Sequence, residues 1–297
     1  MSLLKLTNAQ ISLTVSSRGG SILQLVAHHP TGDQPLLRPA VVSEETPASA
    51  SGCFPLVPFG NRVEGNQFEC NGTRYSLAPN TECDSHYLHG DGWLNEWQCL
   101  EHGSQHILLE YVHAQGVYHY RVQQRFELED CRVLLTLNVT NLGKNAMPFG
   151  LGWHPFFPLE ADTQLQAEAS GYWQEEAQWL AGAHRADIPA DLCFSTAQPL
   201  PRRWVNNGFS GWNGQATITW PQHQQQLRLV TEPACPVYFV FVSDPAFEEG
   251  YCFDFFCFEP MSHAANGHHM SDLGGLKILQ PQGSLSQRMT LSAENMA

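Results

Sequence analysis

Basic residues are scarce in this sequence. Among 297 residues, 15 lysines and arginines stand against 29 aspartates and glutamates, so the formal net charge is −14 with histidine neutral. Nucleic-acid binding requires a basic surface that displaces counterions from phosphates, and anionic membranes attract the same kind of surface. We therefore expect neither nucleic acid nor a membrane as a partner.

Long hydrophobic runs and paired cysteine motifs are also missing. No stretch approaches the roughly 18 to 20 apolar residues of a membrane-spanning helix. The apolar start, Leu3-Leu4, is too short for the core of a signal peptide. The nine cysteines are odd in number, irregularly spaced and without a Cys-x-x-Cys pair, which favours reduced thiols. We expect a cytoplasmic protein, either a monomer or a homodimer.

Helical periodicity is nearly absent, and strand periodicity takes its place. Only segment 172–180 has a helical composition, and it is short. Apolar residues alternate through 118–128 and 133–140 around the polar pair at 129–130, which predicts a hairpin. Further strands are predicted at 11–15, 107–112, 216–220, 227–231, 237–242 and 253–258. With 19 prolines and 24 glycines spread along the chain, the sequence predicts an all-β protein, one large antiparallel β-sandwich over residues 1–297.

Motifs for cofactors and metals are lacking as well. The glycine-rich dinucleotide and phosphate loops, the Gly-x-Ser-x-Gly nucleophile motif and His-Glu-x-x-His are all absent. Among 14 histidines the one dense cluster is His263, His268 and His269, whose spacing matches no zinc motif. We therefore expect no cofactor and no dedicated metal site.

Two loop-like segments in the first third of the chain carry unusual polar residues. Segment 51–62 is rich in proline and glycine and ends in Asn61-Arg62. An arginine offers five rigid donors for sugar hydroxyls or a carboxylate, although a solvated surface turn would look the same. In segment 86–93, His89 lies among glycines, where it could be a donor, a ligand or a satisfied loop residue.

Two later segments hold candidates for proton transfer. In segment 150–158, His154 is wedged among aromatics and prolines, which would fix the imidazole as a general acid requires. A core histidine with a backbone partner fits equally well. Glu259 ends the apolar run at 253–258 and precedes a proline. Burial should raise its pKa and a partner such as Arg62 should oppose the shift, while a structural salt bridge is the alternative.

These four segments, in this order and at these intervals, resemble the aldose 1-epimerase (galactose mutarotase) family over roughly residues 52–260. The resemblance implies a galactose-mutarotase-like supersandwich with an open sugar cleft. It implies that Asn61 and Arg62 bind the sugar, that His89 is a further active-site histidine, that His154 is the general acid and that Glu259 is the base.

The resemblance is imperfect at two positions. Many family members carry a sugar-binding aspartate where segment 205–212 has Asn206, which keeps an acceptor and gains donors but loses the charge. The His-Pro-Phe-Phe sequence at His154 also replaces the His-Thr-Tyr-Phe of the best-known members. Both departures suggest a divergent branch, so the preferred sugar cannot be carried over.

The reaction that the resemblance implies is the interconversion of the α and β anomers of a free aldose, with an aldohexose as the small-molecule partner. Ring opening needs one proton removed from the anomeric hydroxyl and one delivered to the ring oxygen, without cofactor or metal. The alternatives are a hexose-6-phosphate epimerase, which would call for clustered basic residues, and a sugar-binding module without turnover. The mechanism requires Arg62, His89, His154 and Glu259 to converge on one concave face.

Overall fold

The computed structural model describes residues 2–30 and 32–295, which form two large antiparallel sheets and three small ribbons. The 11-stranded sheet, here the first sheet, has β4 (Gln34–Pro35) attached to β3. The order of its other strands is β1 (Leu3–Thr7), β2 (Ile11–Ser16), β3 (Ser21–Ala27), β5 (Cys53–Leu56), β15 (Gly152–Pro158), β24 (Phe255–Met261), β23 (Val237–Val242), β20 (Val205–Ser210), β17 (Gly171–Glu175) and β18 (Ala181–Arg185).

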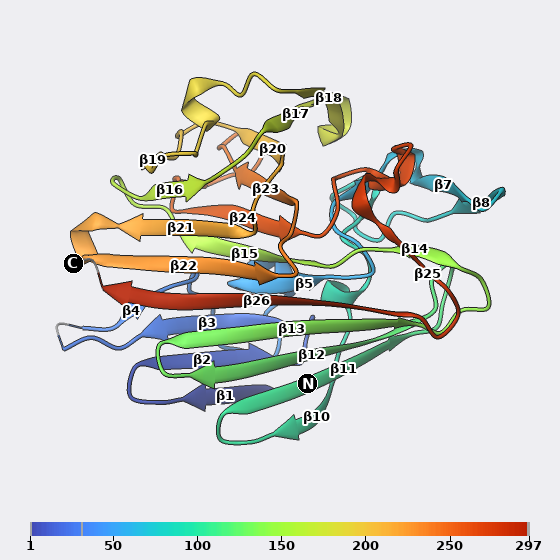
Figure 1. Ribbon diagram of the computed structural model, residues 1–297. Coiled ribbons are helices and arrows are strands. Elements are labelled where there is room, and N and C mark those ends of the chain that lie inside the picture. The colour runs from blue at the N-terminus through green and yellow to red at the C-terminus, as the bar shows by residue number, and fades with distance from the viewer. Residues whose placement is uncertain (1, 31, 296–297) are drawn as a thin grey trace.

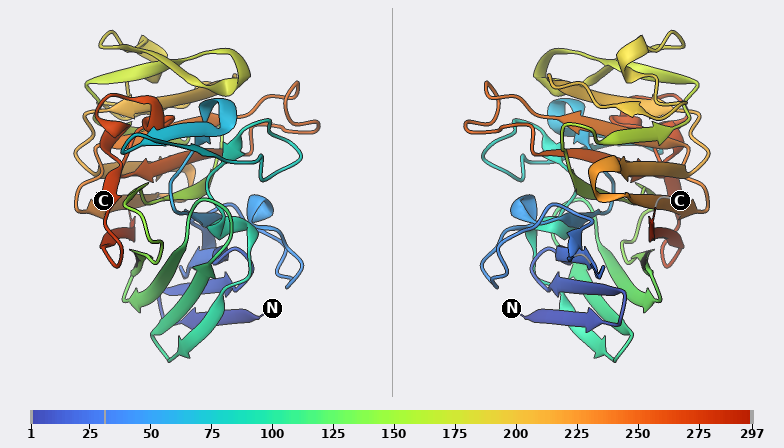
Figure 2. Two further views of the ribbon diagram at one scale, coloured as in Figure 1. Left: turned by 90° about the vertical axis from the view of Figure 1, so that its right-hand side faces the viewer. Right: turned by 90° about the vertical axis from the view of Figure 1, so that its left-hand side faces the viewer.

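The nine-stranded sheet, here the second sheet, stacks against the first (Figures 1 and 2). Its strand order is β10 (Gln98–His102), β11 (His106–His113), β12 (Tyr120–Glu129), β13 (Arg132–Asn141), β26 (Ser284–Asn295), β22 (Gln225–Glu232), β21 (Gln215–Trp220), β16 (Gln164–Ala167) and β19 (Gln198–Pro199). The apolar faces of both sheets contribute to one continuous core, as the alternation of apolar residues along the strands requires.

Short elements complete the described part of the chain. The ribbons are β14 (Met147–Phe149) with β25 (Lys277–Leu279), β6 (Arg62–Val63) with β9 (Tyr87–Leu88), and β7 (Gln67–Cys70) with β8 (Thr73–Ser76). The 3₁₀ turns are η1 (Ala48–Ala50), η2 (Glu64–Asn66), η3 (Gly92–Leu94), η4 (Ala177–Trp179), η5 (Ala190–Leu192), η6 (Pro221–His223), η7 (Gly267–His269) and η8 (Leu273–Gly275). Within residues 2–30 and 32–295, no helix is long and apolar enough to cross a membrane.

The all-β prediction is confirmed, and the predicted strands are present with shifted ends. The predicted hairpin is β12 and β13, and the run at 237–242 is β23 itself. Segment 172–180, the one stretch with a helical composition, forms β17 and η4. Tyr172 of β17 pairs with Phe209 in the first sheet, so tertiary pairing overrides the helical composition. All nine cysteines are free.

Candidate active site

All six predicted site residues line one cavity of about 210 Å³ over the middle of the first sheet. They come from β15, β20 and β24 of that sheet and from the β6–β9 ribbon and its adjoining turns. The residues are Asn61, Arg62, His89, His154, Asn206 and Glu259. The predicted convergence of distant segments is therefore present in the structure.

The register of the first sheet brings the two proton-transfer candidates together. On one side His154 of β15 pairs with Phe54 of β5. On the other side the flanking pairs of β15 and β24 place it opposite Glu259, namely Gly152 with Met261 and Phe156 with Cys257. Glu259 in turn pairs with Phe239 of β23. Side chains directly opposite one another in adjacent strands lie on the same face, so this row forms the cavity floor.

Three of the predicted site residues lie inside strands that were not predicted or that were expected to end sooner. His154, Asn206 and Glu259 lie inside β15, β20 and β24, and β24 continues past Glu259 to Met261. Pro155 made segment 150–158 look like a loop, because proline cannot donate to a ladder. It is tolerated here because β15 pairs with β24 only at residues 152 and 156–158, so no ladder bond to β24 is lost at Pro155.

The remaining two motifs join each other in the β6–β9 ribbon. Arg62 pairs with Leu88, and just beyond this pair the Asn61 N–H donates to His89 Nδ1 at 3.0 Å. The His89 N–H donates in return to the Asn61 carbonyl at 3.0 Å. Both residues adopt positive φ, 63° and 59°, which turns their side chains into the cavity wall. Since Nδ1 accepts, the neutral His89 ring carries its hydrogen on Nε2 and is a donor there.

A buried carboxylate that the sequence analysis missed orients Arg62. Arg62 Nε donates to Asp84 Oδ2 at 2.8 Å, and the other oxygen of Asp84 accepts from the His86 N–H at 2.8 Å. The Asp84 side chain is only 3% exposed, so this ion pair is poorly screened by solvent. The available signal was an acidic residue two positions before segment 86–93, which carries His89.

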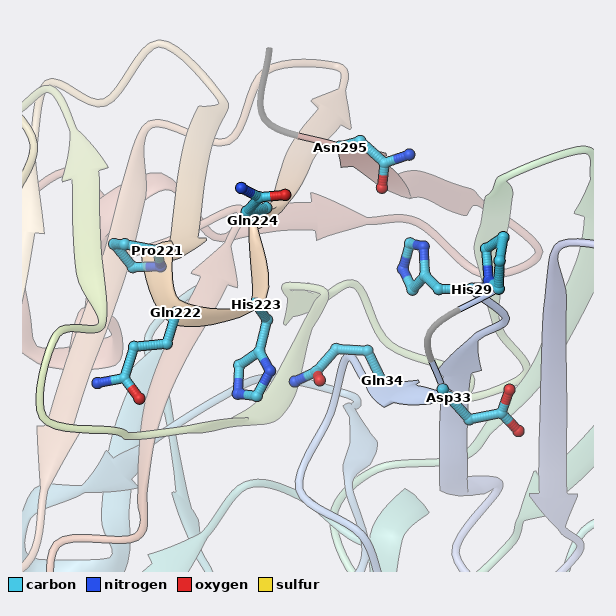
Figure 3. A pocket seen from close by; sticks show the side chains of 10 residues that line it. His29, Asp33, Gln34, Pro221, Gln222, His223, Gln224 and Asn295 are labelled. Atoms are coloured by element: carbon cyan, nitrogen blue, oxygen red, sulfur yellow. The ribbon is translucent and has the colours of Figure 1, made fainter.

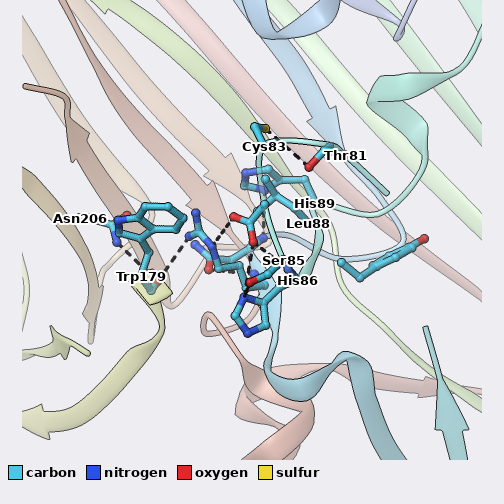
Figure 4. A network of polar contacts seen from close by, with 12 residues as sticks. Thr81, Cys83, Ser85, His86, Leu88, His89, Trp179 and Asn206 are labelled. Carbon is cyan, nitrogen blue, oxygen red and sulfur yellow. Dashed lines mark hydrogen bonds and ion pairs between the residues drawn. The ribbon is translucent and has the colours of Figure 1, made fainter. Parts of the chain in front are cut away.

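Asn206 and Arg62 also share a contact that the sequence did not predict. Their side-chain nitrogens lie 3.5 Å and 3.4 Å from the carbonyl oxygen of Trp179, to which both donate. The Trp179 indole lies 5.4 Å from the Arg62 guanidinium, at the edge of the network in Figure 4. The turn η4 thus covers two of the proposed sugar-binding side chains with a main-chain oxygen.

His154 and Glu259 form a buried pair at the floor of the cavity. His154 Nε2 lies 3.3 Å from Glu259 Oε1, and their side chains are 11% and 3% exposed. Burial lowers the pKa of the His154 imidazole to about 3, and the charge of Arg38 acts in the same direction. Burial raises the pKa of the Glu259 carboxyl to about 8, while the charge of Arg62 opposes the rise. The opposing effects of burial and Arg62 on Glu259 are those expected from the sequence.

The charge state of this pair differs from the expected one. We predicted an ionised Glu259 beside a protonated His154, because opposite charges attract. Burial disfavours both charges, lowering the pKa of His154 and raising that of Glu259, so at neutral pH we expect the proton of the pair to lie on Glu259. Glu259 Oε2 has no hydrogen-bonding partner in the described protein, which a neutral acid tolerates better than an anion. Whether that proton lies on His154 or on Glu259, the pair holds a single proton.

His89, His154 and Glu259 also form the one group of three potential metal ligands found among the described residues, with ligand atoms within 4.8 Å of one another. The contacts of His89 oppose a metal centre. Its Nδ1 accepts from a backbone N–H, so Nε2 bears a hydrogen and has no free lone pair. His263 and His268, from the sequence cluster, are already hydrogen-bonded to the Gly60 N–H and the Tyr118 hydroxyl.

The cavity wall is aromatic, with a single strong cation. Phe54, Phe156, Phe239, Phe241, Phe247 and Trp93 contribute rings. Among the described lining residues, Arg62 is the sole arginine or lysine, and Asp84 already neutralises it. Aromatic faces suit the C–H-rich face of a pyranose, and one neutralised arginine offers little to a phosphate.

A larger groove of about 680 Å³ lies between the β3–β4 connection and η6 (Figure 3). Its two histidines already have partners: His29 contacts Gln225 at 2.6 Å, and His223 pairs with Glu160 at 2.9 Å. The described lining of this groove has no proton-sharing buried pair comparable to that of His154 and Glu259. The groove, over its described residues, therefore lacks the buried acid–base candidates that line the smaller cavity.

Comparisons with known proteins agree with this geometry. The family model described as aldose 1-epimerase matches residues 2–292. An uncharacterized Escherichia coli K12 protein, YphB, is 50% identical over 294 residues, which cover 99% of each chain. A crystal structure from Escherichia coli K12, described provisionally as an aldose 1-epimerase, superposes with a TM-score of 0.95 at 50% identity and 99% coverage of each chain.

A more distant structure establishes the fold alone. The aldose epimerase homologue from Caenorhabditis elegans has a TM-score of 0.83 at 15% identity, with 100% of this chain and 99% of that chain covered. The fold is therefore galactose-mutarotase-like.

Proposed function

The chain belongs to the aldose 1-epimerase family, and we propose that it interconverts the α and β anomers of a free aldose. The observation that carries the proposal is the buried His154–Glu259 pair, which holds one proton at 3.3 Å in a small, sugar-sized cavity. At about 210 Å³ this cavity is below the roughly 300–1,000 Å³ of drug-sized sites, which suits a single small sugar.

The pair can supply both proton transfers of ring opening. A sugar hydroxyl that donates to Glu259, together with the charge of Arg62, favours the ionised carboxylate and moves the shared proton to His154. Glu259 then accepts the anomeric proton while His154 protonates the ring oxygen. Rotation about the bond between the anomeric carbon and its neighbouring carbon presents the other face of the aldehyde to the attacking hydroxyl. Glu259 and His154 then exchange roles when the ring closes.

The other polar side chains orient the sugar. Arg62, aimed by Asp84, and His89, with its hydrogen held on Nε2, donate to hydroxyls that are present throughout the reaction. Asn206 offers an amide where many relatives have a carboxylate. Because the anomeric and ring oxygens are common to all aldopyranoses, this change bears on the choice of sugar more than on the reaction.

Replacing Glu259 tests the proposal most directly. Glu259→Gln keeps the shape of the side chain but cannot accept the anomeric proton, so kcat should fall at least ~10²-fold with little change in KM. Mutarotation of freshly dissolved α-glucose and α-galactose, followed by polarimetry, measures both constants. The matched control is Glu160→Gln, which alters another Glu–His contact of 2.9 Å outside the cavity and should leave kcat unchanged.

Three outcomes separate the alternatives. Normal turnover in folded Glu259→Gln protein would contradict the assigned mechanism and leave a structural pair. Sugar binding by the unaltered protein without accelerated mutarotation would indicate a binding module. Faster conversion of glucose 6-phosphate than of glucose would indicate a phosphosugar enzyme, against which the single neutralised arginine of the cavity argues.

A further inference from the structure

The His154 imidazole packs against two phenyl rings, and one of them extends the contacts beyond the cavity. Its ring lies 4.6 Å from the Phe54 ring at an interplanar angle of 22°, and 4.6 Å from the Phe156 ring at 29°. On Phe156 rests the guanidinium of Arg38, 3.8 Å from the ring centroid. The two phenyl rings lie 6.1 Å from each other at 50°, so they flank the imidazole without enclosing it. The contacts run in series from His154 through Phe156 to Arg38, and these three groups are here the ring stack.

Arg38 is held in place by three hydrogen bonds to main-chain carbonyls. Its Nη2 donates to the carbonyls of Ser49 at 2.8 Å and Ser51 at 2.7 Å, and its main-chain N–H donates to the Phe156 carbonyl at 2.8 Å. The guanidinium also lies 4.5 Å from the Phe255 ring. The planar guanidinium of an arginine with fixed donors can stack on an aromatic face, whereas the flexible ammonium of a lysine cannot.

We propose that Arg38 is a positioning residue for the acid–base pair, clamping Phe156 so that the ring stack holds the His154 imidazole in line with Glu259. The inference rests on the proposed function, because it assigns Arg38 a role in the same proton transfer. Arg38 is absent from the cavity lining, so it acts through the stack rather than by touching the sugar.

The clamp has a geometric and an electrostatic consequence. A displacement of about 1 Å in a proton-transfer geometry can cost on the order of 10²-fold in rate, so a loose imidazole slows the reaction. The Arg38 charge also disfavours the imidazolium, because like charges repel, and it joins burial in lowering the pKa of His154. Without that charge, the shared proton would move toward His154 and would be held to a higher pH.

Other titratable groups surround the stack and stay constant in the test. Besides Glu259, His154 is faced by His89, at 5.2 Å between ring centroids, and by Cys53 from β5. Arg62 from β6 and Cys257 from β24 interact with Glu259. Around Arg38 itself, Glu248, Asp254 and Cys257 counter the effect of burial on its pKa. None of these groups is altered by substitution at position 38.

Two substitutions separate charge from geometry in the full-length protein. Arg38→Met removes the charge and the planar fork, whereas Arg38→Lys keeps the charge and loses the fork. Arg202→Met is the matched control, because Arg202 also lies over a phenyl ring, 5.9 Å from Phe253, and donates to a backbone carbonyl outside the cavity. The readouts are kcat and KM, the alkaline limb of the pH–rate profile, and the ¹⁵N shift of His154 as a function of pH.

For Arg38→Met we expect a kcat reduced about tenfold with KM within about twofold. Its alkaline limb should move up by about 0.5 to 1 pH unit, and the titration of the His154 ¹⁵N shift should move up by a similar amount from its midpoint near pH 3. For Arg38→Lys we expect the same loss of kcat, with the limb and the shift as in the unaltered protein. Arg202→Met should match the unaltered protein in all readouts.

Unchanged kcat, limb and ¹⁵N shift in folded Arg38→Met protein, with only a lower Tm, would overturn the proposal and leave Arg38 a structural residue. If Arg38→Met does not fold, Arg38→Lys decides, since an unchanged kcat there excludes the clamp. The ¹⁵N shift needs no turnover. It therefore reports the effect of the Arg38 charge on His154 even if the unaltered protein fails to accelerate mutarotation, and the two hypotheses can fail separately.

Discussion

At the scale of single residues, the site depends on buried charges whose partners come from elsewhere in the chain. Arg62 is useful to a sugar only if its guanidinium is held in place, and Asp84 holds it from 22 positions away. The pair is nearly inaccessible to solvent, whereas the pair of Asp191 with Arg203 has both side chains 50% exposed. Buried and exposed ion pairs of the same chemistry should therefore respond differently to the same substitution.

Asp84→Asn keeps the acceptor for the His86 N–H but removes the charge that orients Arg62. We expect KM for the sugar to rise about tenfold, since a charge-assisted hydrogen bond contributes roughly 1.5–3 kcal/mol. Polarimetric kinetics at several sugar concentrations measure the change. Asp191→Asn is the control and should leave KM and Tm unaltered. Equal KM values in the two variants would contradict the positioning role of Asp84.

At the scale of elements, the β6–β9 ribbon positions His89 by close backbone contact. Gly90 has a φ of +69°, and a Cβ at this position would lie 2.2 Å from the Val57 carbonyl oxygen. Gly72, in the β7–β8 turn, has a similar φ of +73°, and a Cβ there would have no neighbouring atom within 4 Å. The two glycines share a backbone conformation and differ only in the space around them.

Alanine substitutions at these glycines should therefore separate conformation from contact. Gly72→Ala should lower the free energy of unfolding by about 1–2 kcal/mol, the cost of a left-handed conformation for a residue with a side chain. Gly90→Ala should cost about 2–4 kcal/mol more, because a main-chain oxygen must move, and it should reduce kcat by displacing His89. Urea unfolding and polarimetry test both parts; similar losses of stability in the two variants would contradict the close contact.

At the scale of the whole molecule, buried titratable groups link stability to pH. The folded pKa of Glu259, about 8, lies above its ordinary 4.5, so the folded protein keeps a proton that the unfolded chain releases. Its contribution to stability is therefore lost as pH rises from about 4.5 to 8. His154, His263 and His268 have pKa values lowered by burial from 6.5 to about 3, 4 and 3. Their contributions are lost as pH falls below 6.5.

Glu259→Gln should consequently stabilise the protein at alkaline pH while abolishing turnover. The advantage of the variant in free energy of unfolding should grow between pH 5 and 8 by about 1 kcal/mol per pH unit. Urea unfolding at pH 5, 6, 7 and 8 measures this difference. A pH-independent difference for Glu259→Gln would contradict the raised pKa.

Some strands and site residues of this protein could be predicted from the sequence, and others could not. Alternation of apolar residues depends only on which face of a strand is buried, so β12, β13 and β23 could be predicted from local sequence. Motifs that resemble those of the aldose 1-epimerase family identified Asn61, Arg62, His89, His154 and Glu259 as candidates. No strand was predicted around Pro155, because a proline fits there only through a gap in the pairing with the neighbouring strand. The composition of segment 172–180 gave no sign of β17, which forms by pairing with a distant strand.

Residue order was enough to establish an acidic, all-β chain and the residue types of its cavity. The packed structure was needed to place His154 opposite Glu259, to aim Arg62 through Asp84, to close the ring stack with Arg38 and to cover Asn206 with Trp179. These contacts join residues far apart in the chain, and no local pattern encodes the register between strands. Protonation follows the same rule, because the pKa values of Glu259 and His154 are set by desolvation, which exists only once the sheets have packed.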